Sequence, residues 1–198
     1  MDRLRALFDR MRADHRTAFV PYITAGDPRP ARTVEYVREL AALGADLVEL
    51  GLPFSDPLAD GPVNAAAAER ALQAGATLPA VLDVVRTIRQ SLDLPLVLYS
   101  YLNPLLAQGF ARTVRRIAAA GVDGILILDL PADEAPPYLP DLRRAGLAPI
   151  FLVTPTSTEE RMRRIARIAD GFVYCVSRTG VTGARRSLSP DARSVLRR

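Results

Sequence analysis

The chain has 198 residues, 49% of them hydrophobic, which suits one sizeable core and is short for two, so residues 1–198 are expected to form one domain. Its apolar runs are too short to span a bilayer, and its N-terminal segment lacks the apolar core of a signal peptide, so no membrane partner is expected. Its single cysteine suits a reducing compartment, and we therefore expect a cytoplasmic protein. All 26 residues in the Lys and Arg count are Arg, which excludes enzymes that form a Schiff base with a lysine. The net charge is only +4 and acidic residues lie between the arginines, so no nucleic-acid partner is expected.

The chain begins with a segment of helical spacing, in which Leu4, Leu7, Phe8 and Met11 fall on one face. The only histidine, His15, follows in the same segment and is expected to be a solvated surface side chain. One histidine cannot supply a histidine-rich metal site, and a Ser-His-Asp triad is not expected at this position. The sequence therefore predicts no metal site.

Six short apolar runs follow, and segments with helical spacing separate them. Such near-continuous apolar runs are typical of strands that are buried on both faces of a sheet. Their alternation with helices predicts successive βα units and a parallel sheet. The predicted strands are 19–24, 46–53, 94–102, 123–131, 148–155 and 171–177. The predicted helices between them are 31–44, 77–90, 110–121, 135–146 and 156–170.

Residues at the ends of the predicted helices support these boundaries. Thr77 is placed to cap one helix, and Ser157, with Glu160 three residues later, has the pattern of a capping box. Gly121 and Gly146 suit the left-handed conformation that ends many helices.

Residues 54–76 form an insertion between the second and third predicted strands. Within it, residues 65–73 are predicted to form an extra short helix, with Asn64 as a candidate cap. An insertion after the C-terminal end of a parallel strand lies on the face where such proteins carry their chemistry.

Three carboxyl groups in and after the second predicted strand need separate explanations. Glu49 stands between Val48 and Leu50 inside the strand, so it is either paired with an arginine of a covering helix or held in an apolar pocket that raises its pKa. A raised pKa would make it a competent proton donor near neutral pH. Asp56 in SDP and Asp60 in ADGP occupy sequences typical of turns, so a structural and a functional interpretation of each remain open.

Several strings in the sequence resemble, in the same order, the α subunit family of tryptophan synthase. They are FVPYITAGDP, ADLVELGLPFSDPLADGP, AGVDGILILDLP, PIFLVTPTST and GFVYCVSRTGVTGA. Long strings in order are far more specific than a lone glycine motif, and these extend over essentially the whole chain. The resemblance implies a (β/α)8 barrel of the TIM type, with about six βα units in this sequence. It also implies a carbon-carbon lyase of tryptophan biosynthesis that cleaves indole-3-glycerol phosphate to indole and glyceraldehyde 3-phosphate without a metal or organic cofactor.

The resemblance also implies roles for individual residues. The catalytic glutamate of the family falls on Glu49 and its catalytic aspartate on Asp60, and Tyr174 matches a tyrosine near the reacting centre. The family contacts its β subunit, in an αββα complex, through the loop that contains Pro53 and Asp56. The residues that match substrate-binding positions are Tyr22, Tyr99, Leu126 and Leu152 around the indole ring, and Thr182 and Gly183 in the loop 177–184.

Two carboxyl groups suffice for the implied chemistry because their surroundings differ. Breaking the bond between the indole ring and the glycerol side chain is a retro-aldol step that requires protonation of the ring at C3. Glu49, kept partly protonated by its apolar strand, is the candidate acid, and as a carboxylate it would take the proton of the side-chain hydroxyl. Asp60, ionised in a wetter loop, would accept a hydrogen bond from the ring N–H and stabilise the positive charge that develops there.

The resemblance implies eight strands, whereas the pattern predicts six. The domain is therefore expected to be C-terminally incomplete, without the loops that build much of the phosphate site in such barrels, and the isolated chain is expected to lack lyase activity. Two alternatives remain open, a non-catalytic partner module for the β subunit and a different phosphosugar barrel enzyme. The match of PFSDPLADGP and SRTGVTGA to one family disfavours the second.

Overall fold

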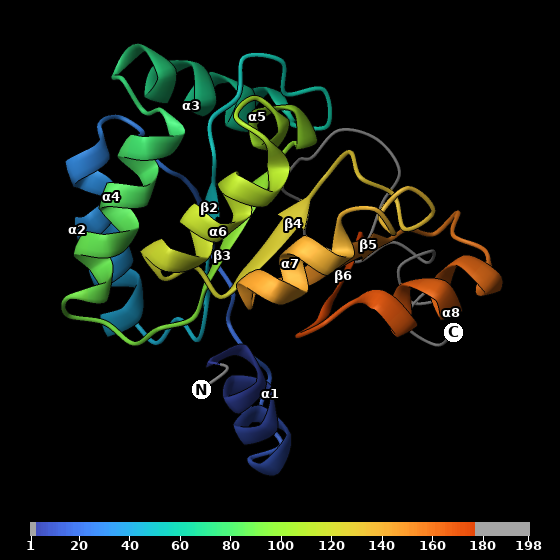
Figure 1. Cartoon of the computed structure of the whole chain (residues 1–198). Coiled ribbons are helices and arrows are strands. Elements are labelled where there is room, and N and C mark those ends of the chain that lie inside the picture. Colours follow the sequence, from blue (N-terminus) through green and yellow to red (C-terminus); the bar gives the residue numbers. More distant parts are fainter. Residues whose placement is uncertain (1–2, 177–198) are drawn as a thin grey trace.

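Six parallel strands form one curled sheet, in which each strand pairs with the next one in the chain (Figure 1). The computed structural model describes residues 3–176. Sequential parallel strands that curl around an interior are the arrangement of a (β/α) barrel, as predicted. The strands are β1 Tyr22–Thr24, β2 Val48–Gly51, β3 Leu96–Ser100, β4 Gly124–Ile127, β5 Ala148–Val153 and β6 Val173–Cys175.

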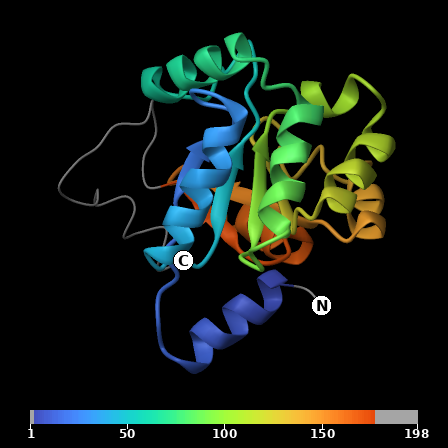
Figure 2. The same ribbon diagram turned by 90° about the vertical axis from the view of Figure 1, so that its left-hand side faces the viewer.

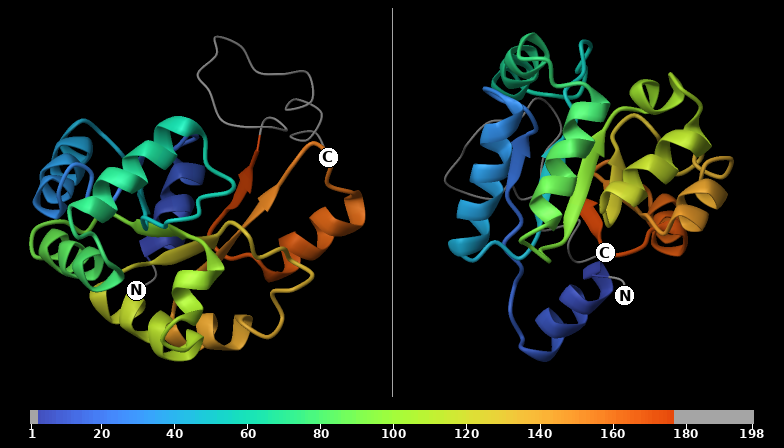
Figure 3. Two further views of the ribbon diagram at one scale, coloured as in Figure 1. Left: turned by 90° about the horizontal axis from the view of Figure 1, so that it is seen from above. Right: turned by 60° about the vertical axis from the view of Figure 1, so that its left-hand side comes forward.

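The helices lie outside the curl of the sheet and at its two ends (Figures 1 and 3). Helices α2, α4, α6, α7 and α8 cover the outer face, whereas α3 and α5 lie beyond the C-terminal ends of the strands and α1 beyond their N-terminal ends. Within residues 3–176, no helix is long and apolar enough to cross a membrane. The helices are α1 Arg3–Ala13, α2 Pro30–Ala42, α3 Pro62–Gln73, α4 Leu78–Arg89, α5 Leu102–Leu106, α6 Phe110–Ala120, α7 Leu139–Ala145 and α8 Glu159–Ile168.

Successive residues of a strand point alternately toward the covering helices and toward the interior of the curl. In β3, Leu98 belongs to the outer hydrophobic cluster and Val97 to the inner one. In β4, Ile125 and Leu126 divide in the same way. The apolar strands are therefore buried on two faces, which explains why they read as near-continuous apolar runs.

Helix α1 closes the N-terminal end of the interior (Figure 2). Its buried residues Leu4, Leu7 and Met11 join Leu47 and Val97 in the inner cluster, as the helical spacing predicts. Burying a large apolar side chain contributes roughly 1.5–3 kcal/mol. The opposite end of the interior, where α3 and α5 lie, is the end that can carry a site.

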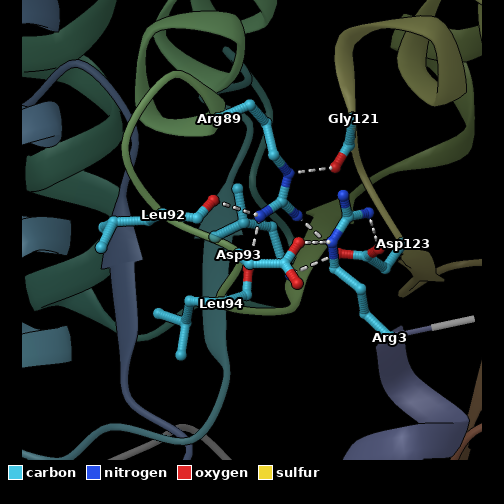
Figure 4. A network of polar contacts seen from close by, with 8 residues as sticks. Arg3, Arg89, Leu92, Asp93, Leu94, Gly121 and Asp123 are labelled. Carbon is cyan, nitrogen blue, oxygen red and sulfur yellow. Dashed lines mark hydrogen bonds and ion pairs between the residues drawn. The ribbon is translucent and has the colours of Figure 1, made fainter. Parts of the chain in front are cut away.

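An ion-pair network ties α1 to the N-terminal ends of β3 and β4 (Figure 4). The Asp123 carboxylate accepts hydrogen bonds from Arg89 at 2.6 Å and from Arg3 at 3.0 Å. It also accepts one from the backbone N–H of Leu96 at 2.8 Å. Arg89 in turn donates to the carbonyl oxygen of Gly121 at 2.8 Å. Because the Arg89 and Asp123 side chains are only 11% and 7% exposed, removal of Asp123 would leave a largely buried guanidinium group without its ion-pair partner.

The predicted order of strands and covering helices is confirmed, with boundaries moved by a few residues. The Thr77 side chain caps α4 and accepts a hydrogen bond from the backbone N–H of Ala80, as expected. Gly121 and Gly146 end α6 and α7 in the left-handed conformation. His15 is exposed, just beyond the end of α1.

The predicted start of the inserted helix α3 is wrong. The helix begins at Pro62 with Gly61 at its N-cap, and not at Ala65 after Asn64. Proline has the backbone φ of a first helical residue and needs no hydrogen bond from its nitrogen, so the helix can begin one turn earlier.

Two further local predictions are wrong. Thr158 caps α8, with its side chain accepting from the backbone N–H of Arg161 at 3.2 Å, whereas Ser157 had the capping-box pattern. The sequence pattern also does not indicate α5, because residues 94–102 form one apolar run. In the structure β3 stops at Ser100, and a separate short helix begins at Leu102.

Candidate active site

Each strand contributes one of the residues predicted for the site. The strand register pairs Tyr22 with Glu49, Tyr99 with Leu126, and Leu152 with Tyr174. Tyr99, Leu126, Leu152 and Tyr174 all belong to the inner cluster, so their side chains gather in the interior of the curl. Side chains that line the interior near the C-terminal ends of the strands are placed where (β/α) barrels carry their chemistry.

Glu49 is a buried carboxyl group with no charge partner in the part of the chain that the structure describes. The residue is 3% exposed, and its Oε1 atom is buried with no hydrogen-bond partner among the described residues. Burial raises the pKa of Glu49 from its ordinary 4.5 to about 7. Within residues 3–176 this agrees with the apolar-pocket interpretation of the sequence and not with an ion pair to a helix arginine. At neutral pH the protonated and ionised forms then coexist, which suits a group that both gives and takes a proton.

Asp60 lies in the loop between β2 and α3, and its two oxygen atoms have different surroundings. Oδ2 accepts a hydrogen bond from the Tyr101 hydroxyl at 2.9 Å. Oδ1 is buried and has no hydrogen-bond partner in the described part of the chain. A buried acceptor without a donor is costly, so Oδ1 is ready to accept a hydrogen bond from a ligand.

The three predicted tyrosines lie near the two carboxyl groups. Tyr22 and Tyr99 meet edge to face, with ring centroids 5.1 Å apart. Burial raises the pKa of Tyr22 to about 12, and the charges of Asp60 and Glu49 act in the same direction. Burial also raises the pKa of Tyr99, helped by the charge of Asp60. It raises the pKa of Tyr174 as well, helped by the charge of Glu49. The phenols therefore stay protonated at neutral pH.

Gly51 allows Tyr22 to approach β2 closely. A Cβ atom at position 51 would lie 2.1 Å from the Tyr22 hydroxyl oxygen, so any other residue there would displace the phenol. The Tyr22 hydroxyl also lies 3.4 Å from the Thr24 hydroxyl. Close packing against Tyr22 thus explains the glycine at position 51, and Tyr22 lies opposite Glu49 in the strand register.

The remaining predicted residues lie in loops. Pro53 is buried and Asp56 is exposed in the loop between β2 and α3, where Asp56 accepts a hydrogen bond from the Ser55 hydroxyl at 2.6 Å. Leu58, in the same loop, is 95% exposed. Thr182 and Gly183, the residues of the loop 177–184 that are predicted to bind the substrate, lie outside the described residues.

Sequence reasoning missed Tyr101, which contacts Asp60 directly. Tyr101 is 5% exposed, and its ring lies 5.3 Å from that of Phe54. The available signal was an aromatic residue just beyond the C-terminal end of a buried strand, at the face that carries the insertion. The pattern could not separate Tyr101 from the apolar run that precedes it.

The site combines a carboxyl group poised between two protonation states, a second carboxyl with an unused acceptor oxygen, and a surface of aromatic and aliphatic side chains. Such a set can bind a planar apolar ring, accept a hydrogen bond from it and transfer protons. Within residues 3–176, no group of three His, Cys, Asp or Glu side chains is arranged to hold a metal ion.

Sequence comparisons match this chain to one family. The family model described as "Tryptophan synthase alpha chain" matches residues 8–198. The tryptophan synthase alpha chain of Solibacter usitatus is 50% identical over 189 residues, which cover 96% of this chain and 71% of that protein. The alpha chain of Geobacter sulfurreducens is 50% identical over 194 residues, which cover 98% of this chain and 74% of that protein.

Solved structures agree with the sequence relatives. Tryptophan synthase subunit alpha from Legionella pneumophila superimposes with a TM-score of 0.86 at 40% identity, covering 89% of this chain and 68% of that one. A Mycobacterium tuberculosis tryptophan synthase structure gives 0.90 at 37% identity, covering 99% and 76%. A tryptophan synthase a2b2 complex from Pyrococcus furiosus gives 0.86 at 38% identity, covering 91% and 72%. The chain belongs to the tryptophan synthase alpha chain family.

Proposed function

We propose that this chain carries the lyase site of tryptophan synthase, the site at which indole-3-glycerol phosphate is cleaved to indole and glyceraldehyde 3-phosphate. Membership of the alpha chain family supports the reaction. The observation that carries the proposal is Glu49, a carboxyl group on the inner face of β2 whose pKa burial raises to about 7. A buried acid without a partner destabilises a fold, so its placement is best explained by a proton that it must transfer.

The two carboxyl groups divide the work. Protonated Glu49 delivers its proton to C3 of the indole ring, which turns the ring into an electron sink. The resulting carboxylate takes the proton from the hydroxyl on the carbon attached to the ring, and the electrons of the carbon-carbon bond return to the ring as the aldehyde forms. Asp60 accepts a hydrogen bond from the ring N–H, and its negative charge stabilises the positive charge on the protonated ring.

The surrounding residues bind the substrate in this proposal. The indole ring packs against Tyr22, Tyr99, Leu126 and Leu152, and Tyr174 supports the reacting centre beside Glu49. The backbone of Gly183 contacts the phosphate group and Thr182 binds the substrate, as the family resemblance implies. No metal or organic cofactor has a role, because Glu49 and Asp60 supply the proton transfer and charge stabilisation that a retro-aldol step needs.

We also propose that residues 1–198 form one domain that acts in the cytoplasm and assembles with a tryptophan synthase β chain. One Pyrococcus furiosus structure that this fold matches is a tryptophan synthase a2b2 complex, which supports the assembly. The loop with Pro53 and Asp56 would make the contact, and its exposed Leu58 offers apolar surface for a partner. The single cysteine favours the cytoplasm, since no internal disulfide is possible.

Replacement of Glu49 by Gln tests the proposal. Glutamine has nearly the same shape but cannot exchange a proton, so indole release should fall by at least roughly a hundredfold while the Kd for substrate changes little. Release of indole from indole-3-glycerol phosphate is followed with and without an added β chain. The control is Glu39→Gln, at an exposed carboxyl of α2, which should match the wild type. A Glu49→Gln turnover within tenfold of wild type would remove Glu49 from the mechanism.

The two alternatives are less well supported. A different phosphosugar barrel enzyme is disfavoured, because the family model and the relatives all name the tryptophan synthase alpha chain. A non-catalytic partner module would give no reason for the buried carboxyl oxygens Oε1 of Glu49 and Oδ1 of Asp60, to which no other described residue donates a hydrogen bond. A chain that binds the β chain and substrate but releases no indole in either assay would favour the partner module.

A further inference from the structure

We infer that Tyr101 is a positioning residue that orients Asp60 toward the ring N–H of the substrate. The inference rests on the proposed function and adds to it the residue that sets the geometry of the second carboxyl group. The Tyr101 hydroxyl group makes two hydrogen bonds. The Tyr101 oxygen accepts a hydrogen bond from the backbone N–H of Ala59 at 2.9 Å, and the same hydroxyl donates to Asp60 Oδ2 at 2.9 Å.

These two contacts leave one arrangement for the Tyr101 proton. The backbone N–H of Ala59 can only donate, and an ionised carboxylate can only accept, so the phenol proton must point at Asp60. The pKa of Tyr101 is raised to about 12, chiefly by burial, which keeps that proton in place across the physiological range. Linked hydrogen bonds of this kind polarise and strengthen one another, so the Asp60 carboxylate is held in one orientation.

Tyr101 is itself held firmly enough to act as an anchor. It is 5% exposed, and it lies between β3 and α5, where its carbonyl oxygen accepts from the Ser100 hydroxyl at 2.9 Å. The next backbone N–H, that of Leu102, donates to Asp129 at 2.7 Å. The Tyr101 ring also packs on Phe54, at the other end of the loop that carries Asp60. A single side chain thus fixes this loop at Phe54, Ala59 and Asp60.

The arrangement divides the work between the two oxygen atoms of Asp60. Oδ2 is occupied by Tyr101, and Oδ1 is buried without a donor among the described residues. Because Oδ2 is held by the hydrogen bond from Tyr101, the carboxylate group cannot rotate freely. Oδ1 therefore remains available as the acceptor for a ligand N–H. Without the Tyr101 hydroxyl, Asp60 Oδ2 and the Ala59 N–H both lose this partner, and this end of the loop loses the side chain that holds it.

The test replaces Tyr101 by Phe, which removes only the hydroxyl and keeps the ring that packs on Phe54. The matched control is Tyr138→Phe, at a ring that packs on Phe110 between α6 and α7. Three quantities are measured for the full chain with the β chain added: amide hydrogen exchange at Ala59, the melting temperature, and turnover of two substrates. The substrates are indole-3-glycerol phosphate and its 1-methylindole analogue, which has no ring N–H to donate.

Tyr101→Phe should speed exchange of the Ala59 amide by at least roughly tenfold and lower kcat for the N–H substrate by roughly tenfold to a hundredfold, with KM changing less. The preference for the N–H substrate over the methylated one should fall to that of Asp60→Asn, and combining Tyr101→Phe with Asp60→Asn should cause no further loss. Tyr138→Phe should change none of these quantities.

The outcomes separate this inference from the proposed function. Slow Ala59 exchange in Tyr101→Phe, or exchange already fast in the wild type, would overturn the role of Tyr101 whether or not indole is released. Equal losses on both substrates, accompanied by a lower melting temperature, would also overturn it, because they indicate a structural role only. Faster Ala59 exchange in a protein that releases no indole would support the contact and contradict the proposed reaction.

Discussion

The burial of Glu49 destabilises the fold, and in the proposed mechanism the same burial serves the reaction. Nothing among the described residues offers its Oε1 atom a donor, and its pKa is raised to about 7. A better-paired carboxyl group would have a lower pKa and would be a weaker proton donor at neutral pH. At position 49 the unpaired buried carboxyl group therefore lowers the stability of the fold, whereas its raised pKa suits the proposed proton transfer.

This conflict predicts a pH-dependent stability difference between wild type and Glu49→Gln. Below the ordinary pKa of 4.5 Glu49 is protonated in the folded and unfolded states, and its contribution to stability is fully present. As the pH rises through about 7, the unfolded chain has already ionised, and that contribution is lost. The variant should therefore match the wild type near pH 4 and exceed its free energy of unfolding at pH 8 by about 3 kcal/mol. Urea unfolding from pH 4 to pH 8 measures this, and parallel curves would contradict the raised pKa.

The residues of the site were predictable from sequence to different degrees. Glu49 was accessible because a lone acid in an apolar strand violates the local pattern, and such violations mark functional sites. Asp60 in ADGP read equally well as a turn residue, and only the family resemblance favoured a role. Tyr101 could not be predicted, because its role depends on hydrogen bonds to Ala59 and Asp60 across the site.

The network around Asp123 shows how a few charges can hold one element in place. Asp123→Asn removes the charge that balances Arg89, whose side chain is 11% exposed, and weakens the contact of α1 through Arg3. Breaking a buried ion pair in this way should lower the free energy of unfolding by about 3–5 kcal/mol, as measured in urea.

The control for this prediction is Asp83→Asn, which breaks an ion pair to Arg86 on the exposed face of α4. Exposed pairs contribute less than about 1 kcal/mol, so this variant should unfold almost like the wild type. Equal losses from Asp123→Asn and Asp83→Asn would show that the buried network does not hold α1.

Elements with a clear period were predicted best. The helical spacing in α1 and the apolar runs of the six strands follow directly from one buried stripe or two buried faces. Helix α5 was not predicted because so short a helix has too few residues to show a helical period. The start of α8 was misplaced because Ser157 and Thr158 are adjacent cap residues, and only the backbone determines that Thr158 accepts the hydrogen bond.

For the whole molecule, the alternation of strands and helices was enough to predict a parallel sheet, whose strands pair in chain order in the structure. The sequence pattern alone did not distinguish a barrel from an open sheet, because both alternate strand and helix. The barrel type was predicted from the family resemblance, and the inner cluster, where α1 side chains meet Leu126 and Ile150, supports the curl of the sheet.

The assembly proposed for the molecule predicts a role for Leu58. Its side chain is 95% exposed in the loop between β2 and α3, and burial against a partner would contribute roughly 1.5–3 kcal/mol. Leu58→Asp should weaken association with the β chain by roughly tenfold to a hundredfold, measured by sedimentation or calorimetry, without lowering the melting temperature. Leu43→Asp, at a leucine just after α2 that is 78% exposed, should leave association unchanged. Equal association by both variants would place the contact elsewhere.

In the proposed mechanism Glu49 on β2 lies in the substrate site, and its apolar surroundings raise its pKa. The most direct measurement is a titration of the Glu49 side-chain carboxyl by ¹³C NMR, with and without a non-cleavable indole phosphate analogue, using Glu49→Gln to assign the signal. We predict a midpoint near the value of about 7 in the free protein, and a higher midpoint when the bound ring excludes water. A midpoint near the ordinary 4.5 that the analogue leaves unchanged would contradict the account.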